Sequence, residues 1–264
     1  MLRQLVLSSI LLATTAACGV SPMGRNQLLL LSDAQLGRQG VAAYAQYKQQ
    51  IPLSKSARDQ KYVKCITTAI AAEVSEGNIP ASWEVNTFQD ESPNAFAIPG
   101  GKIGVHTGLL DVSDNQDQVA AVLGHEVAHV LARHSNERAS AQQAAGIAMA
   151  GAGAAGVDPN VMQALGMGAQ YGMLLPYSRT HESEADLMGL DLMAKAGFDP
   201  RQSVVFWENM DTVAAKTGGQ APPEILSTHP GSQTRKSDLN ERMPHAMKLY
   251  AQARSLGKKP RCTR

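Results

Sequence analysis

The sequence predicts an α+β fold that is mainly helical, with one small sheet beside a central helix. Apolar residues recur at intervals of three and four along most of the chain, whereas residues 83–106 alternate in short, strand-like runs around Pro99-Gly100-Gly101. The central helix is expected from about Asp117 to Ser140, because Asp114, Asn115 and Asp117 offer N-cap and first-turn acidic chemistry and apolar residues follow at helical spacing.

Helical patterns precede and follow the strand-like runs. Ser32-Asp33 and the segment Ser54 to Ser56 offer caps for the first two helices. The almost uncharged residues 139–156 predict a loosely held helix or a mobile loop, because glycines interrupt the alanines. The remaining predicted elements are helices at 32–50, 54–77 and 159–175, strands at 83–88, 94–98 and 102–106, and helices after Asp186, Asp199-Pro200 and Arg235.

The composition excludes some partners. The 264 residues contain 24 basic and 23 acidic side chains, with a formal net charge of +1. This balance gives no basic stripe, so nucleic acid is not an expected partner. A chain of this length can bury one substantial core.

The first residues have the pattern of an export signal. One arginine precedes the apolar run Leu5–Leu12, and small residues lead to Cys18. This pattern resembles a bacterial lipobox, in which the cysteine is lipidated after cleavage, although Thr15 stands where leucine is usual. Gly19, instead of aspartate, favours the outer membrane. We therefore expect a signal peptide over 1–17 and a lipid anchor on Cys18 that faces the periplasm, with a soluble periplasmic protein as the alternative.

Two further cysteines remain in an exported chain. Cys65 and Cys262 can pair, which would tie the C-terminus to an early helix; two unpaired thiols are the alternative. Neither belongs to a Cys-x-x-Cys or Cys/His cluster, so a cysteine-based metal site or nucleophile has little support.

The central helix carries His125-Glu126-Val127-Ala128-His129. Two histidines four residues apart leave the same helix face and can both reach one tetrahedral zinc ion. Glu126 then stands beside the metal, where a carboxylate can take a proton from a metal-bound water. A surface helix that carries two histidines by chance is the alternative.

A second group of acidic residues offers the third zinc ligand. Glu182 and Asp186 lie four residues apart and share a helix face, whereas Glu184 points roughly 200° away from Glu182. Glutamate from a later helix is one established third ligand. Glu182 is therefore expected to bind zinc while Asp186 hydrogen-bonds the outer nitrogen of a ligand histidine.

These motifs, in their order, resemble the zinc metallopeptidases related to HtpX and the CAAX prenyl protease. The resemblance covers roughly residues 30–250 and is carried by 94–101, 108–110, 125–129 and 182–186. It implies a zincin, gluzincin-like fold with His125, His129 and Glu182 as zinc ligands, Glu126 as general base and Asp186 as partner of a ligand. The export signal makes the chain most similar to the periplasmic or outer-membrane lipoprotein type, the LoiP type.

Three other histidines are weaker candidates. His134 lies about 140° off the zinc face and is expected to be structural or at the surface. His181 points about 100° away from Glu182 and is not an expected ligand. His106 is expected to be exposed on its strand, with lining of the cleft as the alternative.

The resemblance also points to residues near the last helix. In that family a segment such as His229-Pro230 places its histidine near the metal with an arginine, here Arg235, close by. His229 is a candidate to stabilise the oxyanion or to occupy the open zinc position. Arg235 is a candidate to orient it or to bind a substrate carbonyl, Asn94 is a further substrate candidate, and helix capping is the alternative role of the segment.

The expected function is zinc-dependent peptide hydrolysis in the bacterial envelope, with one zinc ion per chain. Unfolded or misassembled envelope proteins are the expected substrates, the sheet edge their binding site, and outer-membrane assembly machinery a candidate partner. The expected organisation is a linker at 18–31, a metallopeptidase domain at 32–256 and a tail at 257–264. A non-catalytic, zinc-stabilised scaffold or chaperone is the alternative.

Overall fold

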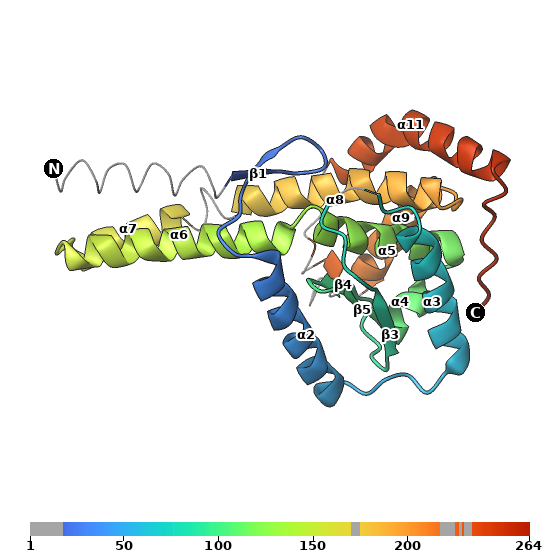
Figure 1. The fold of residues 1–264 in the computed structure, drawn as a ribbon, viewed down its shortest axis with the longest axis horizontal. Helices are drawn as coiled ribbons and strands as arrows, with labels where there is room; N and C mark the ends of the chain where they lie inside the picture. The colour runs from blue at the N-terminus through green and yellow to red at the C-terminus, as the bar shows by residue number, and fades with distance from the viewer. Residues whose placement is uncertain (1–17, 76, 170–174, 217–224, 227–228, 230–233) are drawn as a thin grey trace.

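The computed structural model describes residues 18–75, 77–169, 175–216, 225–226, 229 and 234–264 (Figure 1). This part of the chain is mainly helical with two small sheets, which confirms the predicted fold class. The predicted signal peptide at 1–17 lies outside the described residues.

The larger sheet has three strands in the order β3-β5-β4. β3 (Glu84–Phe88) runs parallel to β5 (Lys102–His106), and β4 (Ala95–Ile98) runs antiparallel to β5. The β4–β5 turn needs its two glycines, because Gly100 and Gly101 have φ values of 93° and 75°. Within the described residues β4 is an edge strand, and this edge faces the central helix.

α5 (Gln116–Leu131) is the centre of the fold. The Asn115 side chain caps it by accepting hydrogen bonds from the backbone N–H groups of Asp117 and Gln118. Almost every residue from Gln118 to Leu131 is buried, because α5 is covered by the sheet and by other helices. These helices are α3 (Ala57–Ala71), α8 (Leu175–Lys195) and α9 (Gln202–Lys216), with α4 (Thr107–Val112) following β5.

α5 and α8 cross at two glycines. A Cβ atom on Gly189 of α8 would lie 2.6 Å from the backbone nitrogen of His125, and one on Gly124 would lie 2.7 Å from the Gly189 carbonyl oxygen. No other residue permits this approach of the two backbones. The crossing therefore fixes α8, which carries Glu182 and Asp186, against the histidines of α5.

The prediction of one helix from 117 to 140 is wrong at its middle. α5 ends at Leu131, Arg133 adopts a left-handed conformation with φ 55°, and α6 (His134–Ala154) begins at the next residue. Tertiary contacts hold this break: Gln27 donates to the Ala132 carbonyl at 2.6 Å, and Arg133 pairs with Asp33 at 2.8 Å.

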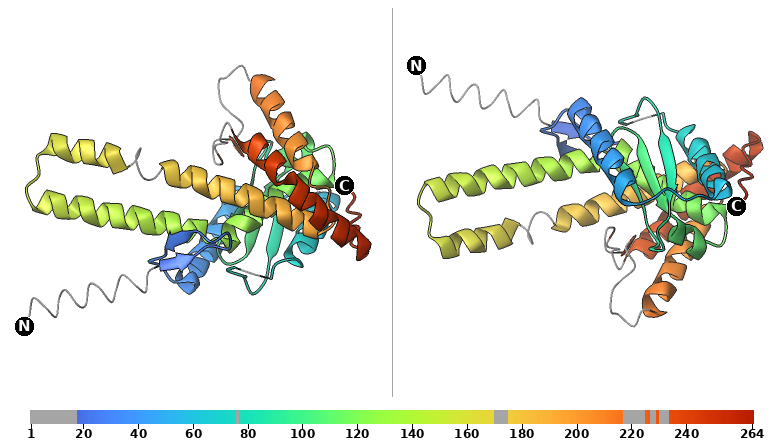
Figure 2. Two further views of the ribbon diagram at one scale, coloured as in Figure 1. Left: turned by 90° about the horizontal axis from the view of Figure 1, so that it is seen from above. Right: turned by 90° about the horizontal axis from the view of Figure 1, so that it is seen from below.

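α6 forms a long arm with α7 (Pro159–Ala169). The two helices run antiparallel and project away from the sheet, with the start of α8 continuing beside α6 (Figure 2). Residues 139–154 are thus helical, as one of the two predicted alternatives. Beyond Ala141 none of the described α6 side chains is buried. No helix among the described residues has the length and apolar character needed to cross a membrane.

The N-terminal residues form a hairpin and a helix. β1 (Cys18–Val20) pairs antiparallel with β2 (Asn26–Leu28), and the chain then follows the base of α6, where the Leu30 N–H donates to Ser140 Oγ at 2.8 Å. Within the predicted linker, Arg25, Gln27, Leu30 and Leu31 hydrogen-bond residues of α6 or the residue Ala132 before it. α2 (Asp33–Gln50) covers the sheet, where its buried Tyr44 donates to the Ile103 carbonyl at 2.7 Å.

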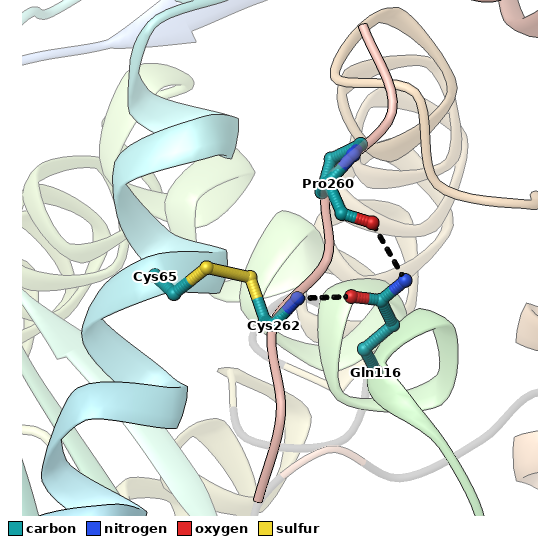
Figure 3. The surroundings of a disulfide bond; sticks show 4 residues. All are labelled: Cys65, Gln116, Pro260 and Cys262. Carbon is teal, nitrogen blue, oxygen red and sulfur yellow. Dashed lines mark hydrogen bonds between the residues drawn. A yellow bond between two sulfur atoms is a disulfide. The ribbon is translucent and has the colours of Figure 1, made fainter.

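The C-terminal helix α11 (Arg235–Ser255) packs on α8, and the tail returns to the start of α5. A disulfide joins Cys65 of α3 to Cys262, with their Cα atoms 5.8 Å apart (Figure 3). Gln116 donates to the Pro260 carbonyl at 3.0 Å and accepts from the Cys262 N–H at 2.8 Å. The sequence allowed either a disulfide or two unpaired thiols, and the structure contains the disulfide.

Candidate metal centre

Four side chains from three parts of the chain converge at the centre of the fold. His125 and His129 come from α5, Glu182 from α8, and His229 from the segment before α11; one donor atom of each lies within 4.8 Å of all the others. The Nε2 atoms of His125 and His129 are 2.9 Å apart, and Glu182 Oε2 lies 3.3 Å from the former. The three predicted ligands therefore meet, and His229 joins them.

The separations fit one metal ion. Zinc–ligand bonds near ~2.0 Å in a tetrahedron place neighbouring donor atoms roughly 3.3 Å apart. The measured separations include 3.4 Å between His129 Nε2 and Glu182 Oε1, and 3.2 Å between His125 Nε2 and His229 Nδ1. Glu182 Oε1 is buried and has no hydrogen-bond partner among the described residues, as expected for an atom whose partner is a cation. The donor set of imidazoles and one carboxylate suits a divalent ion.

Glu126 stands beside this group without belonging to it. Its Oε2 atom accepts a hydrogen bond from the Ala97 N–H of β4 at 2.9 Å, and its Oε1 atom lies 3.3 Å from His229 Nε2. Only 2 % of Glu126 is exposed, and this burial raises the pKa of its carboxyl group. A carboxylate with a raised pKa is suited to accept a proton and later release it.

Asp186 and Arg235 hydrogen-bond the candidate ligands His125 and Glu182. Asp186 Oδ1 lies 2.9 Å from His125 Nδ1, as predicted from its spacing to Glu182. The buried Arg235 donates to Asp186 Oδ2 at 2.6 Å and to Glu182 Oε2 at 3.1 Å, and its guanidinium lies 4.0 Å from the ring centre of Trp207. Arg235 thus orients the two acidic side chains.

Burial and neighbouring charges shift the pKa values of the donor side chains in different directions. Burial disfavours a charged His125, but hydrogen bonds to Asp186 and Glu182 raise its pKa to about 10. Burial, and then the charge of His125, lower the pKa of His129 well below its usual value. The pKa of Glu182 is lowered despite its burial, because His125 and His229 hydrogen-bond its carboxylate. A cation bound at this point would take the place of the proton on Nε2 of a charged His125, while the proton on Nδ1 stays directed at Asp186.

The remaining sequence candidates lie elsewhere. His106 is 1 % exposed, with Nε2 2.6 Å from the Tyr47 hydroxyl and Nδ1 2.8 Å from Ser92 Oγ; the predicted exposure is wrong because α2 covers this part of the sheet. Asn94 is buried before β4 and its carbonyl accepts from the His106 N–H, so its role toward substrate stays a prediction.

A second buried polar group lies behind His129. His134 is 1 % exposed, which excludes the surface alternative, and lies 2.8 Å from His129 between their Nδ1 atoms. His181 lies 3.0 Å from Glu137 through Nε2 and is not one of the four donors, as predicted. Arg25 and Glu137 also belong to this group, and no local sequence pattern points to them because they are 112 residues apart along the chain.

A helix with two histidine ligands and a neighbouring glutamate, completed by a glutamate from a later helix, is the donor arrangement of His-Glu-x-x-His metallopeptidases. The chain belongs to Peptidase family M48, whose model matches residues 57–243. The family resemblance is confirmed, and the narrower LoiP type stays a prediction.

Three relatives illustrate the range of the family. The mitochondrial metalloendopeptidase OMA1 of Schizosaccharomyces pombe is 39% identical over 165 residues, which are 62% of this chain and 48% of that protein. Human mitochondrial OMA1 is 33% identical over 249 residues, 87% of this chain and 47% of that protein. The beta-barrel assembly-enhancing protease of Escherichia coli is 28% identical over 243 residues, 88% of this chain and 48% of that protein. The chain spans about half the length of these curated relatives.

Proposed function

We propose that the chain is a zinc-dependent endopeptidase. The observation that carries this proposal is the position of Glu126, buried beside four converging donor atoms but not among them. A metal site that serves only the fold needs no such carboxylate. Zinc is proposed because two imidazoles and one glutamate form an established catalytic zinc site.

A bound zinc ion would supply Lewis-acid chemistry, polarising the scissile carbonyl and making a water molecule easier to deprotonate. Glu126 accepts the proton of the attacking water on Oε1, the atom not bound by Ala97, and later delivers it to the leaving amine. Asp186 keeps the proton of His125 on Nδ1, so that Nε2 faces the donor group.

His229 is proposed to have two positions. Its Nδ1 atom lies 3.1 Å from Glu182 Oε2 and its Nε2 atom 3.3 Å from Glu126, so it fills the side of the group on which a substrate carbonyl would bind. This arrangement supports a resting state in which His229 is itself a ligand. Substrate then displaces the ring, which is placed to donate to the developing oxyanion.

The substrate is proposed to be an extended, unfolded segment of another protein. The β4 edge lies beside Glu126, and the Ala97 N–H on this edge already binds the carboxylate. A peptide added along such an edge is held by backbone hydrogen bonds with little dependence on its sequence. This mode of binding suits removal of unfolded or misassembled chains.

We further propose that the protein works in the bacterial envelope, anchored in the outer membrane through Cys18 and exposed to the periplasm, as in the LoiP type. Three observations support this: the export pattern at 1–17, the Cys65–Cys262 disulfide, and the likeness to the beta-barrel assembly-enhancing protease. Outer-membrane assembly proteins are then candidate clients. Metabolic labelling with a palmitate analogue should mark the wild type and not Cys18→Ser; an unlabelled wild type would contradict the anchor.

The decisive experiment is cleavage of unfolded casein by the purified chain and by Glu126→Gln. We expect the wild type to cleave casein until a chelator is added and to regain activity with zinc. Glu126→Gln should lose about 10²- to 10⁴-fold in rate, because the general base is removed, while it still binds one zinc ion. A wild type that binds zinc and suppresses casein aggregation without cleavage would favour the scaffold or chaperone alternative.

A further inference from the structure

The two histidines of α5 have different outer partners. The Nδ1 atom of His125 faces the carboxylate of Asp186, which fixes its tautomer. The Nδ1 atom of His129 instead faces a third imidazole, the Nδ1 atom of His134 at 2.8 Å. His134 Nε2 in turn lies 3.1 Å from Glu184 Oε2. All of these groups are buried.

The proton positions along His129, His134 and Glu184 are fixed by the acidic end. Two Nδ1 atoms can share a hydrogen bond only when one of them carries the proton. A carboxylate accepts and does not donate, so Glu184 requires the proton of a neutral His134 to be on Nε2. His134 Nδ1 is then an acceptor, and the proton of His129 must be on Nδ1. This leaves His129 Nε2 free to bind a metal ion.

The opposite arrangement would disable the ligand. If His134 carried its proton on Nδ1, it would donate a hydrogen bond to His129 Nδ1. The proton of a neutral His129 would then have to be on Nε2. That atom lies 2.9 Å from His125 Nε2, inside the donor group, where a proton excludes a metal ion.

The backbone is bent to bring His134 to this place. On a continuous helix His134 would lie about 140° around the axis from His129. Arg133 adopts the left-handed conformation instead, with φ 55°, and α6 starts as a separate helix at His134. A left-handed conformation is unfavourable for a residue with a side chain, and such conformations cluster at functional sites.

The N-terminal hairpin completes the arrangement. Arg25, between β1 and β2, donates to Glu184 Oε2 through Nε at 3.1 Å and through its second terminal nitrogen at 3.0 Å. The same guanidinium makes two hydrogen bonds of 2.6 Å to Glu137 of α6. Arg25 thereby holds the Glu184 carboxylate in the direction of His134.

We propose that Glu184 and His134 form a relay that sets the tautomer of the metal ligand His129, and that Arg25 makes the N-terminal hairpin a working part of the metal centre. The proposal rests on the proposed zinc site, but assigns residues outside the four donors. His134, Glu184 and Arg25 are positioning residues that act through His129. Because Arg25 lies seven residues after Cys18, an anchored N-terminus would be connected directly to the metal site.

Zinc affinity of the full chain, measured at neutral pH by competition with a chromophoric chelator, tests the relay. His134→Leu keeps an apolar volume but offers no acceptor, and we expect a 10- to 100-fold loss of affinity, the size usual for outer partners of a ligand. In His134→Asn the amide oxygen takes the place of Nδ1 and can still accept from His129, so most of the affinity should return. Glu184→Gln should lose about 10-fold, because its amide can donate to His134 and favour the wrong tautomer.

Glu137→Gln is the matched control. It removes a carboxylate from the same buried group and from the same arginine, but the Glu137 carboxylate binds Arg25, Gln27 and His181 instead of His134 or His129. We expect the variant to lower the thermal stability of the metal-free protein while the zinc affinity of the folded protein changes less than about 3-fold. Thermal unfolding of every variant without metal separates folding from binding.

The outcomes distinguish this inference from the proposed function. A wild type without zinc affinity contradicts the zinc site itself. A wild type that binds zinc and cleaves casein, together with His134→Leu and Glu184→Gln of unchanged affinity, contradicts only the relay. Equal losses in His134→Leu and His134→Asn would also overturn it, because they would indicate packing as the cause.

Discussion

Glu137 shows how one residue can couple the hairpin to the pH of the surroundings. Its side chain is fully buried, and burial alone would raise the pKa of its carboxyl group. Hydrogen bonds from Arg25, His181 and Gln27 reverse this effect and lower the pKa to about 2.

This shift predicts a loss of stability in acid. Because the folded pKa lies below the unfolded value of about 4.5, the unfolded chain binds the proton more readily. The contribution of Glu137 is complete above the unfolded pKa and is lost as the pH falls toward 2. We expect this loss to lower the free energy of unfolding by about 2 kcal/mol between pH 5 and pH 3, measured by urea unfolding.

Glu137→Gln is the comparison for this measurement. The variant should be less stable than the wild type at pH 5, and its stability should fall by less between pH 5 and pH 3. If both proteins lose stability in parallel, the Glu137 carboxylate does not carry the acid sensitivity.

Residue spacing predicted three of the donors and the outer partner of His125, but not the outer partners of His129. His125, His129, Glu182 and Asp186 are each four residues from another member, so one helix turn brings each pair to one face. The same rule misplaced His134, because it was extended through Ala132 and Arg133, where the helix breaks.

At the scale of elements, the site depends on the crossing of α5 and α8. The three atoms nearest to a Cβ on Gly189 lie within 3 Å and belong to the backbone of α5, at His125 and Gly124. No side chain can rotate away to make room, so one helix would have to move. Such a movement separates the histidines of α5 from Glu182 and Asp186.

Gly189→Ala is therefore expected to weaken both folding and metal binding. Overpacking of this kind costs on the order of 1–3 kcal/mol, and we expect zinc affinity to fall by at least about 10-fold as the donor atoms separate. Gly146→Ala in α6 is the matched control, because a Cβ there meets no atom within 4 Å. It should be neutral or stabilise by up to about 1 kcal/mol. Thermal unfolding and zinc titration measure both effects, and equal behaviour of the two variants would refute the close crossing.

Most elements could be predicted because their ends have local signals. Ser32 and Asn115 cap α2 and α5 as expected, and Gly100-Gly101 forms the predicted turn of the sheet. The break between α5 and α6 has no such signal: neither glycine nor proline occurs from Leu131 to His134. Contacts from the N-terminal segment, distant in sequence, hold it.

At the scale of the whole molecule, the C-terminal tail is linked to α3, an element far away in the sequence. The disulfide joins residues 197 positions apart, and Arg264 adds an ion pair to Asp59 of α3 at 2.8 Å. The sequence offered this pairing only as one alternative, because two cysteines so far apart carry no information about their distance in space. The fold brings them together by returning the tail along α3 and the start of α5.

Closing so long a loop restricts the unfolded chain strongly. The loop-entropy estimate for this separation is about 5 kcal/mol, and measured losses are commonly about 2–5 kcal/mol. We expect Cys262→Ser to lower the free energy of unfolding within that range in urea. Zinc affinity of the folded protein should stay unchanged, because Gln116, which holds the tail, lies nine residues before His125, about 14 Å along α5.

The double variant Cys65→Ser, Cys262→Ser separates the cross-link from the thiols. It should be as stable as Cys262→Ser alone, because the bond is already absent in the single variant. A much greater loss in the double variant would show that Cys65 stabilises α3 by packing. A loss of zinc affinity in Cys262→Ser would show instead that the disulfide-bonded tail holds α5 in the position that the metal ligands require. The effect of the lost disulfide would then reach the metal site through α5.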